Sequence, residues 1–150
     1  VPNRAPVPKR AISAPEVLNE AVDYEPRPSS FSRGMRVDLA DATLLFLSGT
    51  ASVDELGKTV HPGDFATQCL RTYRNLTRLL TAEGASWHDV VRTSCYLRDI
   101  ERDYDLFNDI RTMFMKRVGL DPVPASTGIQ ARLCRSDLLI EMEAIAIVRR

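Results

Sequence analysis

Hydrophobic and polar positions follow regular patterns from Phe31 onward, and these patterns predict five strands and two helices. Five segments have the residue pattern of strands: residues 31–39, 43–50, 90–97, 126–133 and 138–148. Two segments place apolar residues on one helical face, and a glycine follows each: residues 62–83, with Pro62 in the first turn, and residues 102–118. The order β-β-α-β-α-β-β predicts an α+β domain in which two helices cover one face of a mixed sheet.

Proline is concentrated at the start of the chain, where residues 1–28 hold six of the nine prolines. Proline fixes φ and removes a backbone donor, so this segment predicts neither an interior strand nor a long helix. We expect residues 1–28 to form an extended arm with one helical turn around residues 15–20. Residues 29–150 are then expected to form the folded domain.

The last predicted strand carries a different kind of side chain on each face, because successive residues of a strand point to opposite sides. The helix side holds Ile140, Met142, Ala144 and Ala146, and the other side holds Glu141, Glu143, Ile145 and Ile147. In the strand at 90–97 the helix side holds Val91, Cys95 and Leu97, and the other side holds Arg92, Ser94, Tyr96 and Arg98. The mixed face is either solvated or a contact between copies of the chain, and its two isoleucines favour the contact.

Charge and hydropathy narrow the range of partners. Twenty Lys and Arg residues balance twenty Asp and Glu residues, so the formal net charge is zero. General attraction to nucleic acid or to an anionic membrane needs a sustained basic excess, which the chain lacks. No apolar run approaches the roughly 18–20 residues of a membrane-spanning helix. Residues 1–8 do not have the pattern of a secretory signal, so a cytoplasmic protein is expected.

Cysteine and histidine are too few and too scattered to predict a metal site. Cys69, Cys95 and Cys134 form no CxxC pair, and His61 and His88 are the only histidines. A structural zinc site takes about four such ligands at close spacing. We therefore expect no metal and no cofactor, and we expect carboxylates to carry any acid–base chemistry.

Short segments spread over the domain resemble the YjgF/Rid family of reactive-intermediate deaminases, also called endoribonuclease L-PSP proteins. In chain order they are Leu47-Ser48-Gly49-Thr50, Gln68 with Asn75-Leu76, the run from Val91 to Asp99, Phe107-Asn108, Pro124-Ala125 and the run from Glu141 to Ala146. The resemblance covers roughly residues 30–148. It implies a chorismate-mutase-like α+β fold and a homotrimer with its sites in clefts between subunits.

The resemblance implies hydrolysis assisted by a glutamate, but a family arginine is missing. In deaminating members an arginine after the Pro-Ala pair grips the substrate carboxylate, and a later glutamate positions the water that hydrolyses an imine. Glu141 fills the glutamate position, whereas Ser126 replaces the arginine and Phe31 replaces a tyrosine common in the family. Serine cannot make a charge-assisted bidentate contact. We therefore expect hydrolysis of an imine, enamine or enol ether of a carboxylated metabolite, but not standard 2-imino acid deamination.

A second resemblance runs through the same part of the chain. Three segments are similar to the catalytic half of chorismatases: the run from Ser48 to Ser52, His61-Pro62-Gly63-Asp64, and Cys134-Arg135 shortly before Glu141. Chorismatases share the Rid fold and release pyruvate from chorismate. The resemblance implies an acid role for Glu141 and a pocket-wall role for Cys134.

The predicted site centres on Glu141, which would handle the proton or the water. The predicted substrate-binding residues are Ser126, Thr127, Arg98, Asn108, Cys134, Phe31 and Gly49. Strand carboxylates in clefts can act as general acids or bases. Backbone N–H groups next to Gly49 could bind an oxyanion.

Each candidate also has a structural interpretation. Glu141 could be an interface carboxylate paired with an arginine, and Arg92 and Arg98 could form salt bridges between subunits or bind the substrate carboxylate. Asn108 could be solvated on its helix, and Cys134 could be a small buried apolar residue. A non-catalytic ligand-binding or chaperone-like trimer is therefore the alternative to an enzyme. Some relatives are described as ribonucleases, but the balanced charge does not support a nucleic-acid partner.

Overall fold

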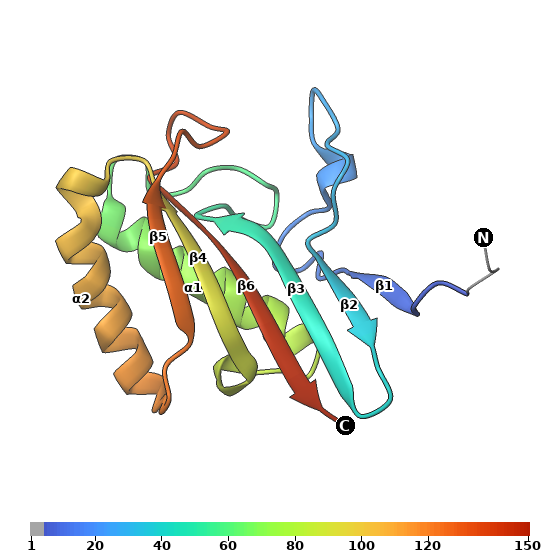
Figure 1. Cartoon of the computed structure of the whole chain (residues 1–150). Helices are drawn as coiled ribbons and strands as arrows, with labels where there is room; N and C mark the ends of the chain where they lie inside the picture. Colours follow the sequence, from blue (N-terminus) through green and yellow to red (C-terminus); the bar gives the residue numbers. More distant parts are fainter. Residues whose placement is uncertain (1–4) are drawn as a thin grey trace.

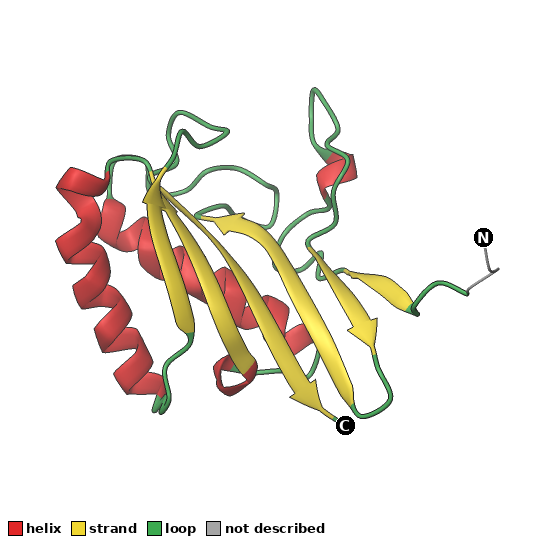
Figure 2. Ribbon diagram, in the orientation of Figure 1, coloured by secondary structure: helices red, strands yellow, loops and turns green. Residues whose placement is uncertain are grey.

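The computed structural model describes residues 5–150, which form a six-stranded sheet with both α-helices on one side (Figures 1 and 2). The strands are β1 (Lys9–Ile12), β2 (Gly34–Asp38), β3 (Ala42–Ala51), β4 (Val90–Leu97), β5 (Ala125–Gln130) and β6 (Ile140–Arg149). The helices are α1 (Phe65–Ala82) and α2 (Ile100–Val118), with short 3₁₀ turns η1 (Ala21–Asp23) and η2 (Trp87–Asp89). The strand order is β1-β2-β3-β6-β4-β5, with only β4 and β5 parallel. The predicted α+β fold class is confirmed.

Side-chain caps set the start of each helix. Asp64 accepts a hydrogen bond from the Thr67 backbone N–H at 3.0 Å, so α1 begins at Phe65 and the prediction of Pro62 in its first turn is wrong. Asp99 caps α2 in the same way, by accepting from the Arg102 N–H at 3.0 Å. Gly119 ends α2 in the left-handed conformation at φ 76°, as the sequence predicts.

The proline-rich segment packs on the domain from residue 9 onward. β1 pairs antiparallel with β2 at the edge of the sheet, a position that proline-rich chain tolerates. Ile12, Val17 and Leu18 are buried in the same core as the helices. The expected turn is present, with the Val17 and Leu18 N–H groups both donating to the Ala14 carbonyl. Residues 1–4 of the predicted arm lie outside the described residues.

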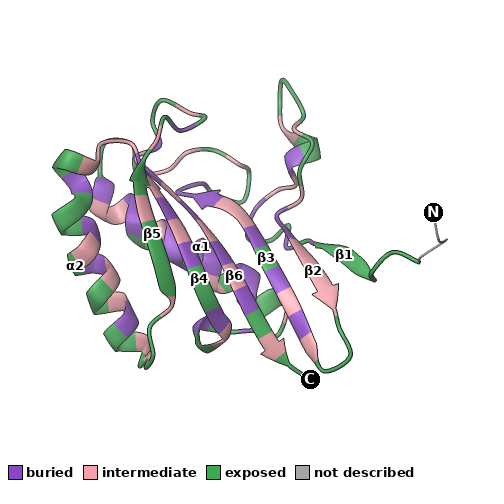
Figure 3. Cartoon of the chain, viewed as in Figure 1, coloured by how far each residue is buried: buried purple, intermediate pink, exposed green. Residues whose placement is uncertain are grey.

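The sheet face opposite the helices, called the uncovered face below, is rich in apolar side chains. Side chains paired across it include Met35, Phe46 and Ile145 in one row and Val37, Leu44 and Ile147 in the next. Phe46 and Ile147 are 40% and 45% exposed, whereas their neighbours on the helix side, such as Leu45 and Ala146, are buried. Figure 3 shows this alternation along β3 and β6. The faces predicted for β6 are confirmed.

One predicted side-chain direction in β4 is wrong. Val91 was expected to face the helices but is 43% exposed, because the β4–β6 pairing shifts register between Val90 and Arg92. Val90 and Thr93 are buried on the helix side instead. Cys95 and Leu97 follow the expected alternation and are buried.

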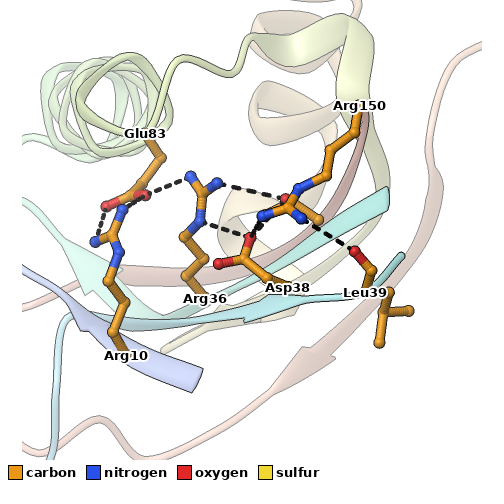
Figure 4. A network of polar contacts seen from close by, with 7 residues as sticks. Arg10, Arg36, Asp38, Leu39, Glu83 and Arg150 are labelled. Carbon is orange, nitrogen blue, oxygen red and sulfur yellow. Dashed lines mark hydrogen bonds and ion pairs between the residues drawn. The ribbon is translucent and has the colours of Figure 1, made fainter. Parts of the chain in front are cut away.

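A charged network joins the amino-terminal edge strand to the rest of the domain (Figure 4). Glu83, just after α1, accepts hydrogen bonds from both Arg10 of β1 and Arg36 of β2, at 2.7 Å and 3.1 Å for the shared oxygen. Its side chain is only 4% exposed. Arg36 also pairs with Asp38, which in turn pairs with Arg150 near the end of β6. The two arginines offset the unfavourable position of a carboxylate at a helix C-terminus.

We expect Glu83→Gln to destabilise the domain by about 1.5–3 kcal/mol, the usual contribution of hydrogen bonds to charged groups. The cause is the loss of the negative charge that two arginines share. Denaturant unfolding of the variant measures the effect. Glu16→Gln is the matched control, because Glu16 is exposed. Equal unfolding midpoints for the two variants would contradict a structural role for the network.

Candidate active site

A bulge in β3 brings the backbone of Gly49 against the carboxylate of Glu141. The β3–β6 pairing runs from Leu47 opposite Ala144 to Thr50 opposite Met142, so Ser48 and Gly49 together face a single residue of β6. A Cβ atom on Gly49 would lie 2.0 Å from Glu141 Oε1. Glycine is therefore the residue that leaves room for the carboxylate at this point of the sheet.

The Glu141 carboxyl is half-buried, and its surroundings favour the neutral form. Burial raises its pKa, and the nearby Glu143 carboxylate raises it further. Glu141 forms no ion pair with an arginine or lysine of residues 5–150, so the predicted arginine pairing is not present within the chain. Glu143, by contrast, accepts a hydrogen bond from the Tyr96 hydroxyl at 3.0 Å. Of the two carboxyls, Glu141 is the one available to exchange a proton with a ligand.

Glu141 opens into a cavity of about 320 Å³ between β3 and the proline-rich segment. Three predicted residues, Phe31, Gly49 and Cys134, share this cavity with Glu141. Cys134 is an exposed thiol, whereas Cys69 and Cys95 are buried in the core. Burial raises the pKa of Cys69 to about 12, which makes that thiol inert.

Sequence reasoning missed an aromatic and cationic wall of the same cavity. Tyr24 lies edge-to-face with Phe31 at 6.3 Å between ring centroids, and Arg33 lies over both rings at 5.2 Å and 5.6 Å. Arg33 is buried and donates to the Asn19 carbonyl. Arg135 lies 5.6 Å from the Tyr24 ring and donates to the Gly57 carbonyl. Tyr24 belongs to the segment predicted as an arm, which has no periodic pattern to place it.

Arg98 binds the backbone of the loop that precedes β6. Its Nε donates to the Leu138 carbonyl at 2.6 Å, and its Nη2 donates to the Arg135 carbonyl. These bonds hold the loop between β5 and β6, which carries Cys134 and Arg135 to the cavity. Within one copy, Arg98 therefore positions the loop, and its binding of a substrate carboxylate stays a prediction.

The remaining predicted residues lie away from Glu141. The Ser126 hydroxyl lies 3.1 Å from that of Thr93, which is buried on the helix side of the sheet. Asn108 shares a second cavity with Ser126, between α2 and β5. Thr127 lies on the uncovered face, where its hydroxyl accepts from Arg92 at 2.9 Å. One copy of the chain thus divides the predicted site between the two faces of the sheet.

The sequence matches a known protein family over most of its length. The sequence profile of the family described as Endoribonuclease L-PSP matches residues 24–148. The chain belongs to this family. The match begins at Tyr24, so it includes the aromatic wall of the Glu141 cavity.

Relatives within the endoribonuclease L-PSP family carry several functional names. A RutC family protein of Pyrococcus abyssi is 29% identical over 81% of this chain and 89% of its own length. A 2-iminobutanoate/2-iminopropanoate deaminase of Rattus norvegicus is 26% identical over 87% and 91%. A chorismatase of Streptomyces rapamycinicus is 31% identical over 81% of this chain, which spans only 38% of that relative.

Solved structures confirm the fold. The YjgF gene product of E. coli matches with a TM-score of 0.73 and 24% identity, over 93% of this chain and 99% of that one. E. coli TdcF with bound serine gives a TM-score of 0.74 at 22% identity, over 93% and 98%. Among residues 5–150, no helix is long and apolar enough to cross a membrane.

For any reaction that uses Glu141, Gly49→Ala is expected to lower turnover about a hundredfold. The added methyl would displace the Glu141 carboxylate, and small displacements of reacting groups have effects of this size. The substitution keeps the backbone in a strand, so the far-ultraviolet circular dichroism spectrum should remain that of the wild type. Steady-state kinetics of the variant measure the effect. Unchanged kinetics would show that the position of the Glu141 carboxylate does not matter.

Proposed function

We propose that this chain is a hydrolase of a small carboxylated metabolite, acting on an imine, enamine or enol ether as a homotrimer, with Glu141 as the proton-transfer group. The half-buried Glu141 carboxyl carries this proposal, because it has no ion-pair partner among residues 5–150 and lies against Gly49 at the wall of a cavity. A carboxyl with a raised pKa holds a proton more readily than an ordinary carboxyl, so it can both accept and return a proton during a reaction. The deaminase names among the relatives support this reaction class.

The chemistry needs one water and one proton carrier. Water adds through its oxygen to the imine carbon, and Glu141 takes a proton from that water. The protonated carboxyl passes this proton to the nitrogen, which gives a carbinolamine. Glu141 then takes the remaining hydroxyl proton and returns it to the nitrogen as the C–N bond breaks, so that ammonia leaves and a ketone remains. For an enol ether, Glu141 donates a proton to the vinyl carbon first. Water then adds at the ether carbon and returns one proton to Glu141, which gives a hemiketal. Transfer of the remaining hydroxyl proton to the ether oxygen breaks the C–O bond, so that the alcohol leaves and a ketone remains.

The uncovered face supports a trimer. Exposed Phe46 and Ile147 lie among paired apolar side chains on three neighbouring strands. A contiguous apolar face of this kind marks a contact surface more often than a solvated one. Polar residues beside it, including Glu143 and Tyr96, would then border a cleft between copies.

An assay panel tests the proposal. One arm generates 2-iminobutanoate with an amino acid oxidase and follows the release of 2-oxobutanoate, and the other supplies chorismate and follows pyruvate. Because Ser126 replaces the family arginine, the expected result is accelerated release in at least one arm, with release from 2-iminobutanoate slower than by an arginine-bearing deaminase. Binding of 2-oxobutanoate without turnover in both arms would instead support a non-catalytic ligand-binding trimer.

A chorismatase-like reaction is the second candidate. Cys134 and Arg135 line the Glu141 cavity beside Tyr24 and Phe31, so a cyclic carboxylate would meet aromatic, cationic and acidic groups together. The chorismatase relative supports this candidate, although the chain spans a minor part of that protein. Pyruvate release from chorismate with no imine hydrolysis would favour it.

A further inference from the structure

The cavity between α2 and β5 is larger than the Glu141 cavity, at about 610 Å³. Much of its wall is apolar, from Met115, Leu120 and Val123. It lies on the helix side of the sheet, since Ser126 in its wall contacts buried Thr93. Its size and lining suit a small organic molecule rather than an ion alone.

Two positively charged residues of α2 line this cavity, Arg111 and the exposed Lys116, and Arg111 is the one that hydrogen bonds hold in place. Its Nη2 donates to Asn108 Oδ1 at 2.6 Å, and its Nη1 donates to Ser126 Oγ at 3.3 Å. Its guanidinium carbon lies 4.9 Å from the centre of the Phe107 ring. All three partners are neutral, and Arg111 forms no ion pair with a carboxylate of residues 5–150. The guanidinium is thus held in place while its charge is left uncompensated.

We propose that Arg111 binds the carboxylate of the substrate, in place of the arginine that Ser126 replaces. This inference rests on the proposed function, because it names the carboxylate-binding residue of the same reaction. The guanidinium of Arg111 reaches Ser126 from the neighbouring helix. It thus supplies the positive charge that an arginine at position 126 of the strand would supply in other members of the family. Two neutral acceptors fix its planar fork, which matches a carboxylate through paired N–H donors. The apolar wall selects a monocarboxylate with a short hydrocarbon group.

The position of Arg111 requires two copies of the chain to complete the site. Ser126 and Arg111 face the helix side of the sheet, and Glu141 lies beside Gly49 on the other. A small metabolite cannot touch both within one copy. Its carboxylate therefore meets Arg111 of one copy while its reacting bond meets the glutamate of a neighbouring copy.

Calorimetric titration with 2-oxobutanoate tests the inference, using the Glu141→Gln chain so that binding is measured apart from turnover. Arg111→Gln is expected to weaken the Kd roughly tenfold to several hundredfold, the effect of losing a charge-assisted contact. Arg117→Gln, an exposed arginine on the same helix, is the matched control and should bind as its parent does. Equal affinities for the Arg111 and Arg117 variants, or no binding by the parent, would overturn the inference.

Moving the arginine from position 111 to position 126 tests whether binding affinity can be restored. Ser126→Arg alone crowds two guanidinium groups, because Arg111 already contacts Ser126, so it should not improve binding. Arg111→Ser combined with Ser126→Arg moves the charge from helix to strand and should recover most of the lost affinity. Failure of the recovery in a folded double variant would count against the role of Arg111. Arg111-dependent binding in a protein without any turnover would reject the proposed reaction but not the carboxylate subsite.

Discussion

Turnover is expected to fall by roughly 10²–10⁴-fold when Glu141 is replaced by glutamine, the usual contribution of a positioned acid or base. Glutamine keeps the size and most of the hydrogen bonding of the side chain but cannot carry the proton. Binding of 2-oxobutanoate should change little, because its carboxylate is assigned to Arg111. Steady-state rates and calorimetric affinities measure the two quantities separately.

The same substitution should stabilise the fold at neutral pH. Burial and Glu143 raise the pKa of Glu141 in the folded chain, so the ionised carboxylate costs folding free energy once the pH exceeds its unfolded pKa. Glutamine removes that cost. The gain in melting temperature should shrink as the pH falls and vanish below the unfolded pKa, where both states bind the proton.

Glu143→Gln is the matched control for Glu141. It can still accept from Tyr96 but no longer places a second negative charge near Glu141. The pKa of Glu141 should fall, moving the corresponding limb of the pH–activity profile to lower pH while activity is retained. A fully active Glu141→Gln protein with a lowered melting temperature would assign Glu141 a structural role. That result would exclude Glu141 as the proton-transfer group and favour a non-catalytic ligand-binding trimer.

The second large effect is expected from the uncovered face. Phe46→Lys should convert a trimer of three 16.8 kDa chains into a folded monomer with turnover as low as that of Glu141→Gln. Burying an unpaired lysine in an apolar contact costs several kcal/mol per ion, and each contact is made three times in a trimer. Light scattering of the wild type and the variant measures the masses.

Leu70→Lys is the control for this prediction. Leu70 is 44% exposed, similar to Phe46, but it lies on α1 behind the sheet. Its substitution should leave mass and turnover unchanged. A wild-type protein that is a monodisperse, active monomer would refute a site shared between copies.

Residue alternation was enough to predict five of the six strands and the direction of the Glu141 side chain. Its neighbours Ile140 and Met142 face the helices, so Glu141 must point to the opposite face of the sheet. It failed in β4, where the register shift near Val91 depends on pairing with β6 and has no local sequence pattern. β1 was missed because proline-rich segments lack the strand pattern. Its register comes from pairing with β2 and from the Arg10–Glu83 contact.

The candidate site was predicted in part. The resemblance to the family was sufficient to place both Gly49 and Glu141 in one predicted site, and the structure places them in contact. The position of Tyr24 in the cavity could not be predicted, because an aromatic residue among prolines has no periodic pattern that assigns it to a face. The three-residue spacing of Asn108 and Arg111 predicts contact along a helix. Their approach to Ser126 depends on how α2 packs beside β5.

Each proposed site combines Glu141 of one copy with Arg111 of another, and subunit mixing tests this arrangement most directly. Glu141→Gln chains and Arg111→Gln chains are unfolded together in equal amounts and refolded. Turnover is measured at substrate concentrations well below the weakened Kd of Arg111→Gln, where each parent has little activity alone. Half of the copies then carry an intact Glu141 and the other half an intact Arg111. Random trimers should therefore contain about one quarter of their sites intact and recover about one quarter of wild-type turnover. Turnover no higher than that of the two parents would contradict the account.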